Sequence, residues 1–326
     1  MKLDPQNVLK AGVVGVGNMG RNHLRVLSTM PQFELIGCFD VDRQARQQCA
    51  RHYGIRAFDT EQELFEQVDV AHIVVPSHLH RQLAVLAAKQ GCHVLVEKPI
   101  ALNLEDAQRI IDACQASGTK LCVGHVERFN PAVVSLENIV AHEKMISVDF
   151  RRMSPFSQRM AGTSVVMDLM IHDIDVLLNI CPRPVEHISC QGARIFTDML
   201  DYAQALIRFD NGLLASLTAS RVTESKIRKA QINAKSAFIN VDYLNRSVEI
   251  SRQTHFTLDV GYQLQYKQDN IIEKVFVPLD EPLRAEFACF ANSITTGDPV
   301  VPSGEMGKRA LELCLRIEAE ILKGLR

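Results

Sequence analysis

The stretch KAGVVGVGNMG, Lys10–Gly20, reads as a short buried strand that runs into a glycine-rich turn and then into a helix. Gly15, Gly17 and Gly20 have the spacing G-x-G-x-x-G. In this spacing the first glycine permits a tight turn, the second lets the backbone approach a pyrophosphate, and the third lets the helix pack closely on the strand. The helix entered at Asn18–Met19 points its free N–H groups toward that pyrophosphate. The stretch therefore predicts a dinucleotide-binding turn.

An acidic residue after the next strand indicates which dinucleotide binds. The run Phe33–Phe39 has strand character and is followed by Asp40. A carboxylate at this point accepts hydrogen bonds from the adenosine ribose hydroxyls and repels a 2′-phosphate. The sequence favours NAD over NADP, with the nearby Arg43 as a further candidate contact that weakens this preference. The alternative is an α/β turn that binds nothing, with Asp40 merely ending a strand.

Length and composition limit the class of protein. A chain of 326 residues exceeds the size at which single cores stop growing, so two domains are expected. The formal net charge of −2 gives no electrostatic reason to expect nucleic acid or an anionic membrane as a partner.

The cysteines and the first residues indicate a cytoplasmic protein. The nine cysteines are an odd number without a C-x-x-C pair, and most lie in apolar runs, as small buried thiols do in a reducing compartment. The first residues, MKLDPQN, lack an apolar signal core, and no apolar run is long enough to span a bilayer.

A loop with two histidines follows the strand-like run Val70–Val75, VAHIVV. This β-branched run is typical of a parallel strand buried on both faces. The loop PSHLH then lies at the edge where doubly wound sheets bind ligands. Its candidates for contacting the ribose or nicotinamide side of the cofactor are Pro76, Ser77, His78 and His80. The alternative is a helix N-cap with two solvated histidines. No metal site is expected, because no third ligand with suitable spacing is in view.

The strand-like run His93–Pro99, HVLVEKP, ends in a charged pair at the same edge. Lys98 is placed to hydrogen-bond the nicotinamide side and a substrate hydroxyl oxygen, with Glu97 beside it. Pro99 fixes the backbone after the lysine and is a candidate for a cis peptide bond. A lysine at a strand end is usually only solvated, but its position after a dinucleotide fold favours a functional role.

The pattern of elements changes near His125. Before it, strands alternate with helices, which predicts a parallel sheet with helices on both faces. After it come strand-like runs with turn signals such as Asp210–Gly212, which predict antiparallel neighbours. We therefore expect an α/β protein with an N-terminal Rossmann domain, residues 1–124, and a C-terminal α+β domain, residues 125–326. The second domain is expected to hold a large, mostly antiparallel open sheet that binds substrate and forms a homodimer or homotetramer interface. Its C-terminal helix can return to pack on the first domain.

One helix of the second half, Val165–Cys181, carries candidate chemistry. Asp168, His172 and Asp175 are spaced i, i+4 and i+7 and therefore share a face. A carboxylate one turn from a histidine can hold its tautomer, and histidine is suited to proton transfer near neutral pH. The alternative is a solvated polar face with a helical ion pair.

The glycine turn, Glu97-Lys98-Pro99 and Asp168-x-x-x-His172, in this order, resemble the Gfo/Idh/MocA oxidoreductases over essentially the whole chain. The resemblance implies an NAD-dependent dehydrogenase in which Lys98, Asp168 and His172 form the catalytic group. His172 then takes the hydroxyl proton, Lys98 hydrogen-bonds the reacting oxygen, and Asp168 helps to hold the substrate while hydride passes to C4 of the nicotinamide.

Three further segments are similar to a bacterial branch of this family whose members oxidise the C3 hydroxyl of UDP-N-acetylglucosamine. They are Gly124–Pro131, Met167–Asp175 and Ala219–Arg228. In that branch a pyridoxal-phosphate aminotransferase converts the ketone to an amine for diamino-sugar lipid A. The similarity implies substrate contacts for Arg128 and Asn130. Guanidinium groups bind phosphate bidentately, so the candidates for the diphosphate are Arg152, Arg159 and Arg221.

Alternatives remain open at this point. Each of these arginines can instead be a solvated surface charge. The same catalytic group would serve an inositol, polyol or free-sugar dehydrogenase. A regulator that senses NAD without turnover is a third possibility, against which the intact Lys98, Asp168 and His172 argue.

Overall fold

The structure, a computed structural model, describes residues 8–158, 161–259 and 264–325. The chain divides into two compact units. Unit 1 contains the residues up to Phe129 together with Glu281–Glu312, and unit 2 contains Asn130–Asp280 together with the residues from Leu313 onward. We describe each unit by itself.

Unit 1 contains a six-stranded parallel sheet with the strand order β3-β2-β1-β4-β5-β6. The order reverses between β1 and β4, and ligands of such sheets bind outside the carboxyl ends of the strands at this switch point. The predicted doubly wound fold is confirmed. Its strands are β1 Leu9–Val14, β2 Phe33–Phe39, β3 Arg56–Ala57, β4 Val70–Ile73, β5 His93–Glu97 and β6 Leu121–Gly124.

Three helices of unit 1 begin at residues whose side chains cap them. The side chains of Asp42, Thr60 and Asn103 accept hydrogen bonds from backbone amides of α2, α3 and α5, which satisfies donors that a helix start leaves open. The helices and short 3₁₀ turns are α1 Asn18–Leu27, α2 Arg43–Tyr53, α3 Glu61–Phe65, η2 Ser77–Leu79, α4 His80–Lys89, α5 Leu104–Ala116, η3 Val126–Phe129 and α8 Pro282–Thr296. The late helix α8 adds Leu283, Phe287 and Phe290 to the apolar core of this unit.

Unit 2 contains an eight-stranded sheet with the order β14-β13-β12-β11-β7-β10-β9-β8. Neighbouring strands are antiparallel except β7 and β10, which run parallel. The prediction of a mostly antiparallel sheet is therefore confirmed. The strands are β7 Met145–Met153, β8 Val185–Ala193, β9 Tyr202–Phe209, β10 Leu214–Ser220, β11 Ile227–Ala234, β12 Phe238–Asp242, β13 Ser247–Asp259 and β14 Leu264–Val275.

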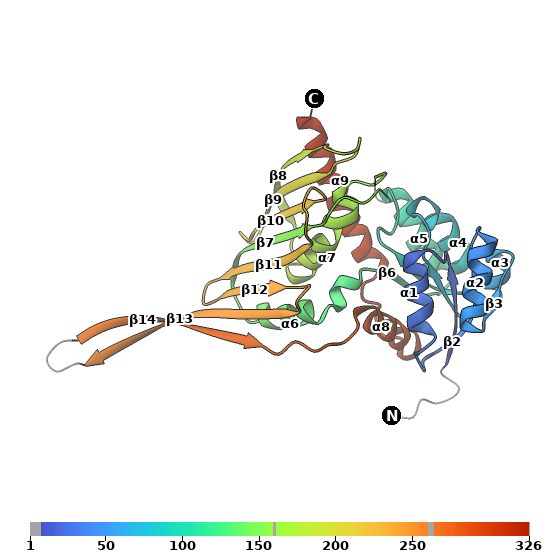
Figure 1. The fold of residues 1–326 in the computed structure, drawn as a ribbon, viewed down its shortest axis with the longest axis horizontal. Helices are drawn as coiled ribbons and strands as arrows, with labels where there is room; N and C mark the ends of the chain where they lie inside the picture. The colour runs from blue at the N-terminus through green and yellow to red at the C-terminus, as the bar shows by residue number, and fades with distance from the viewer. Residues whose placement is uncertain (1–7, 159–160, 260–263, 326) are drawn as a thin grey trace. The chain divides into compact units, whose positions relative to one another are not determined.

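The last two strands are longer than the sequence predicts. The sequence pattern predicts strands over 247–251 and 271–277, whereas β13 and β14 span 13 and 12 residues. Figure 1 shows their outer ends extending past the neighbouring strands as a hairpin. That part of β13 pairs with β14 rather than with the rest of the sheet, so its sequence does not need the apolar alternation of a strand that covers a core.

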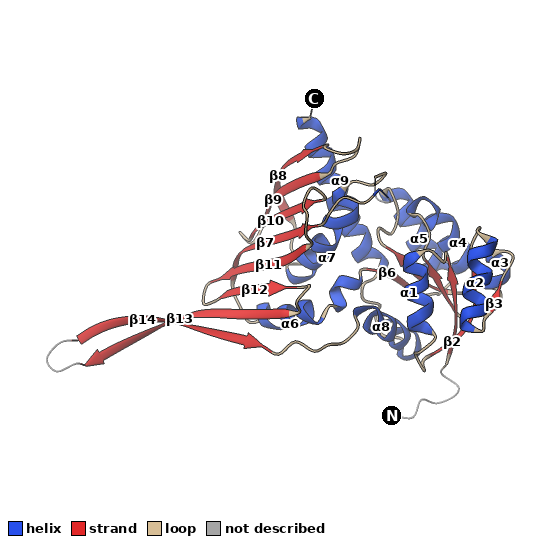
Figure 2. Ribbon diagram, viewed as in Figure 1, coloured by secondary structure: helices blue, strands red, loops and turns tan. Residues whose placement is uncertain are grey.

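Helices cover one face of this sheet (Figure 2). They are α6 Pro131–Val140, the π-helical segment η5 Val166–Met170, α7 Ile171–Ile180 and α9 Gly304–Gly324, whose residues from Leu313 onward belong to unit 2. Strand β9 shows the resulting alternation: Ala205 and Ile207 are buried, whereas Leu206 is 55% exposed. None of the helices in the described ranges combines the length and apolarity that crossing a bilayer requires.

A buried ion pair joins α7 to the sheet. The Arg152 guanidinium on β7 donates to both carboxylate oxygens of Asp173, with N···O distances of 3.0 and 2.7 Å. The two side chains are only 2% and 3% exposed. Paired in this bidentate way, the charges are compensated inside the unit, and removing either one would leave the other buried without its counter-ion.

Replacing Arg152 by Met should destabilise the chain much more than replacing its neighbour Arg151. We expect Arg152→Met to lower the free energy of unfolding by about 3–5 kcal/mol, because the Asp173 charge stays buried. Arg151 is 53% exposed in its ion pair with Asp149, so Arg151→Met should cost less than about 1 kcal/mol. Urea unfolding of both variants measures the difference. Equal losses would show that the buried pair does not hold α7 in place.

Candidate functional site

The glycine turn between β1 and α1 contains two glycines that the fold itself requires. Gly15 has a φ of 91°, which side chains of L-residues rarely adopt. A Cβ at Gly15 would collide with the carbonyl oxygen of Val74, and one at Gly20 with that of Gly15. Gly17 differs, because it is exposed and a Cβ there would meet nothing within 4 Å. The fold leaves this position open, as close approach of a bound group to the backbone requires.

A cavity of about 350 Å³ lies beside this turn. Asp40 faces it from the end of β2, with carboxylate oxygens that accept from the amides of Val16 at 2.7 Å and Asp42 at 2.9 Å. These hydrogen bonds orient the carboxylate, and its remaining lone pairs can accept from hydroxyl groups. The cavity is lined by Val14, Gly15, Gly17, Phe39, Asp40, Val41, Glu61, Val74, Val75, Pro76, Leu79, Gln82 and Leu83.

Several cavity residues were missed by the sequence reasoning. Glu61, Gln82 and Leu79 reach the cavity from α3, α4 and η2, and no sequence motif marks them. Conversely, Arg43 is exposed at the first residue of α2 and does not line the cavity. Asn18 and Met19 form the expected start of α1.

The two histidines of the PSHLH loop have different positions. Ser77 begins the turn η2, and His78 is exposed. His80 is 1% exposed, and its Nδ1 and Nε2 lie 2.9 Å from the carbonyl oxygens of Pro99 and Val75. Burial lowers the pKa of His80, opposed by these hydrogen bonds. Because both ring nitrogens are used by the protein, His80 joins two loops, and this position does not fit the predicted cofactor contact.

Glu97 and Lys98 lie at the end of β5. The Glu97 side chain is 13% exposed and lies 3.0 Å from His23 Nε2, and it also accepts from the Lys98 amide at 3.2 Å. Burial acts to raise the pKa of Glu97, but the His23 hydrogen bond and the nearby positive charge outweigh it, so this pKa is lowered. The peptide bond between Lys98 and Pro99 is cis, as the sequence analysis anticipated.

The strand pairing brings these residues to one edge. β4 pairs with β1 on one side and with β5 on the other, all parallel. The glycine turn, the residues after β4 and Lys98 therefore all follow the carboxyl ends of adjacent strands. A cofactor that extends from the turn along this edge would have its far end near the end of β5.

The helix that carries Asp168 and His172 differs from the predicted uniform α-helix. Asp168 lies in the π-helical segment η5, and His172 lies in the first turn of α7. Both are half-buried, and Asp175 is buried. A π-helical turn holds more residues per turn than an α-helix and is frequent at functional sites. The two residues remain about one turn apart and belong to unit 2, whereas Lys98 belongs to unit 1.

Arg128 and Asn130 are both buried. One Arg128 guanidinium nitrogen lies 3.7 Å from the Met306 sulfur. Asn130 is the N-cap of α6, where its Oδ1 accepts from the Ala132 amide at 3.1 Å and its Nδ2 donates to the Tyr243 carbonyl. Asn130 therefore has a structural role as a helix cap, whereas the sequence predicted only a substrate contact for it.

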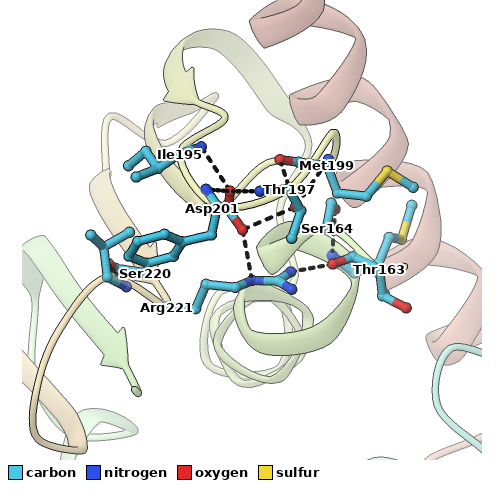
Figure 3. A network of polar contacts seen from close by, with 11 residues as sticks. Thr163, Ser164, Ile195, Thr197, Met199, Asp201, Ser220 and Arg221 are labelled. Carbon is cyan, nitrogen blue, oxygen red and sulfur yellow. Dashed lines mark hydrogen bonds and ion pairs between the residues drawn. The ribbon is translucent and has the colours of Figure 1, made fainter. Parts of the chain in front are cut away.

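Two of the three arginines predicted to bind a diphosphate lie in the described residues, and both make buried contacts within unit 2. Arg152 pairs with Asp173, as described above. Arg221 is 3% exposed, pairs with Asp201 and donates to the Thr163 carbonyl (Figure 3). Asp201 in turn accepts from the amides of residues 195, 196 and 197. Because both guanidinium groups are buried in these ion pairs, Arg152 and Arg221 do not fit the predicted diphosphate contact. Arg159 lies outside the described residues.

Two buried histidines were not singled out by the sequence analysis. His23 on α1 and His72 on β4 are both fully buried, and their Nδ1 atoms are 3.1 Å apart. His23 also reaches Glu97, so a polar chain connects β4 to the residue before Lys98. The one sequence feature that could have indicated this pair is His72, a lone histidine within the apolar strand VAHIVV.

Two family models match the sequence. One, described as an oxidoreductase family with an NAD-binding Rossmann fold, matches residues 9–125. The other, the GFO/IDH/MocA C-terminal domain, matches residues 141–238. Both matches fall on the units as the strands and helices define them.

Similar proteins extend over nearly the whole chain. A UDP-N-acetylglucosamine 3-dehydrogenase from Acidithiobacillus ferrooxidans is 31% identical over 96% of this chain and 97% of its own length. A solved structure of that enzyme, GnnA, has a TM-score of 0.89, with 30% identity and coverage of 98% and 99%. A myo-inositol 2-dehydrogenase from Thermotoga maritima is 24% identical over 94% of each chain.

Alanine substitutions at Gly17 and Gly20 should separate binding from folding. We expect Gly17→Ala to change the free energy of unfolding by less than about 0.5 kcal/mol and to weaken NAD binding at least about tenfold. Gly20→Ala should lower stability by about 1–3 kcal/mol, because its Cβ meets backbone. Calorimetric NAD titration and urea unfolding measure the two effects. Unchanged NAD affinity in Gly17→Ala would place the pyrophosphate elsewhere.

Proposed function

The chain belongs to the Gfo/Idh/MocA family of oxidoreductases, and from this premise we propose that it oxidises a ring hydroxyl of a sugar nucleotide, C3 of UDP-N-acetylglucosamine, to the ketone. The chain is an NAD-dependent dehydrogenase that acts on a CH–OH group. The observation that carries the substrate proposal is the similarity, over 96% of the chain, to a UDP-N-acetylglucosamine 3-dehydrogenase.

The residues present fit the cofactor. The open space at Gly17 and the first amides of α1 would accommodate a pyrophosphate, and the oriented Asp40 carboxylate would accept from ribose hydroxyls. Pro76 lines the same cavity, and Lys98 follows the adjacent strand β5. When bound, NAD supplies the acceptor for the hydride that leaves the substrate carbon.

We propose roles for three side chains in the reaction. His172 accepts the proton of the substrate hydroxyl, since histidine is the side chain suited to proton transfer near neutral pH. Lys98 donates a hydrogen bond to the same oxygen and stabilises the negative charge that develops on it as the proton leaves. Asp168, about one helical turn before His172, holds the imidazole and the substrate. The alcohol thereby loses its hydroxyl proton to His172, while Lys98 holds the oxygen.

An inositol is the second candidate substrate. The similarity to a myo-inositol 2-dehydrogenase covers 94% of the chain at lower identity, and an inositol 2-dehydrogenase matches 52% of it at 30% identity. The same three catalytic side chains would act on a free cyclic polyol. The two candidates differ in whether the substrate carries a diphosphate.

Further parts of the proposal concern the surroundings of the enzyme. We infer a cytoplasmic homodimer or homotetramer that uses the uncovered face of the unit 2 sheet, where Leu206 and Leu214 are exposed. The 3-keto sugar product is a substrate type for a pyridoxal-phosphate aminotransferase, as in diamino-sugar lipid A synthesis.

A substrate panel tests the proposed substrate. We expect NADH to form, as followed by its absorbance, when the protein and NAD are mixed with UDP-N-acetylglucosamine and an aminotransferase that removes the ketone. Free N-acetylglucosamine and myo-inositol should give much lower rates. Turnover of myo-inositol without binding of the sugar nucleotide would replace the proposed substrate by a cyclic polyol.

Lys98→Met should separate catalysis from cofactor binding. We expect kcat to fall by roughly 10²- to 10⁴-fold, since proton-transfer and oxyanion groups contribute on that scale. The dissociation constant of NAD should change less than about threefold. Lys89→Met, at the exposed end of α4, serves as the matched control and should keep full activity. Retained turnover in Lys98→Met would show that the assignment of Lys98 is wrong.

A further inference from the structure

A buried polar chain runs beneath Lys98 through three elements of unit 1. His72 on β4, His23 on α1 and Glu97 at the end of β5 follow one another with contacts of 3.1 Å between the two Nδ1 atoms and 3.0 Å between His23 Nε2 and Glu97 Oε1. Both imidazoles are fully buried. Glu97 Oε2 accepts from the Lys98 amide, so the chain ends on the backbone of the proposed catalytic lysine.

The surroundings of His72 decide the direction of the hydrogen bonds. Its ring packs against Phe287 and Phe33, with centroids 4.6 and 6.2 Å away. Within the described residues its Nε2 atom is buried without a hydrogen-bond partner. A buried N–H without an acceptor is rarer in proteins than an under-satisfied acceptor. His72 therefore carries its proton on Nδ1, and burial holds its pKa well below the ordinary value.

This tautomer fixes the rest of the chain. Because His72 Nδ1 donates, His23 Nδ1 accepts, and the proton of His23 lies on Nε2, where it is donated to Glu97. If Glu97 were protonated, it would donate to His23 Nε2, and His23 Nδ1 would donate to His72 Nδ1. The proton of His72 would then lie on Nε2, against the aromatic rings. The arrangement thus favours the ionised carboxylate at Glu97.

We propose that His23 and His72 act as positioning residues, a neutral donor relay that keeps Glu97 ionised and fixed so that Glu97 holds the backbone of Lys98 in its reactive place. Gly124 on β6 leaves room for this carboxylate, because a Cβ there would lie only 3.1 Å from Glu97 Oε1. This proposal rests on the role given to Lys98 above.

The other titratable groups near Glu97 do not compete with the relay. Burial lowers the pKa of His80 on α4 and raises that of the Cys122 thiol on β6 well above its ordinary value. The positive charge of Lys98 acts in the same direction as the His23 hydrogen bond, lowering the pKa of Glu97. Arg128 on η3 and Glu286 on α8 act with opposite sign on the Cys122 thiol.

The first experiment tests the relay without any substrate. Long-range ¹H–¹⁵N spectra of histidine-labelled protein with NAD distinguish the tautomers, and His23→Gln, His72→Phe and the exposed His142→Ala assign the signals. We expect a neutral Nε2–H form at His23 and a neutral Nδ1–H form at His72 between pH 6 and 8. A doubly protonated His23, or the reverse tautomers, would overturn the relay whether or not the proposed substrate is correct.

The second experiment uses whichever substrate of the panel is turned over. In His23→Leu the imidazole no longer opposes the effect of burial on Glu97, so the pKa of Glu97 rises. Activity is then lost as pH falls through that raised pKa. We expect the acid limb of the kcat/KM profile to move up by at least about one pH unit, with lower kcat and nearly unchanged NAD affinity.

The conservative variant and the control complete the test. His23→Gln keeps a donor toward Glu97 and should restore the wild-type acid limb, while His142→Ala should match the wild type throughout. A wild-type profile in His23→Leu, or no rescue by His23→Gln, would overturn the positioning role. If His23→Leu does not fold, His72→Phe takes its place with the same expected direction, because His23 then loses the donor that fixes its tautomer.

Discussion

The close packing of α1 against the glycine turn is the constraint on which the rest of unit 1 depends. Gly20 lies so near the carbonyl of Gly15 that no side chain fits between them, and this places α1 directly on the sheet. The same placement sets the N-cap of α1, Gly17, at the cavity and brings His23, one turn along the helix, to Glu97. The proposed cofactor site and the proposed support of Lys98 thus depend on one local contact.

Unit 2 depends on a comparable long-range contact, the buried pair of Arg152 and Asp173. It holds α7 to the sheet, and the π-helical segment before α7 carries Asp168 while the first turn of α7 carries His172. Buried arginines in this unit therefore serve the scaffold that presents the helix of the proposed catalytic residues. Figure 3 shows the same principle for Arg221, whose partner Asp201 organises the loop before β9.

Much of the fold could be predicted from local patterns. The parallel and antiparallel halves, the strand β5 ending at Glu97 and the caps Thr60 and Asn103 all follow from periodicity, turn residues and capping chemistry. The long hairpin of β13 and β14 was underestimated, because its outer part pairs only with itself. The return of α8 to the core of unit 1 carries no sequence mark either, since an amphipathic helix does not reveal which apolar face it will cover.

The sequence by itself determined the dinucleotide fold and the cofactor class and pointed to Lys98, Asp168 and His172 as candidate catalytic residues, because glycine geometry and residue type act locally. Only the tertiary structure decided which charged and polar groups form buried contacts that stabilise the fold. Arg152 meets Asp173 and His23 meets Glu97 across 21 and 74 residues of sequence. A buried charge needs a partner wherever the fold supplies one, and the identity of that partner depends on packing between distant elements.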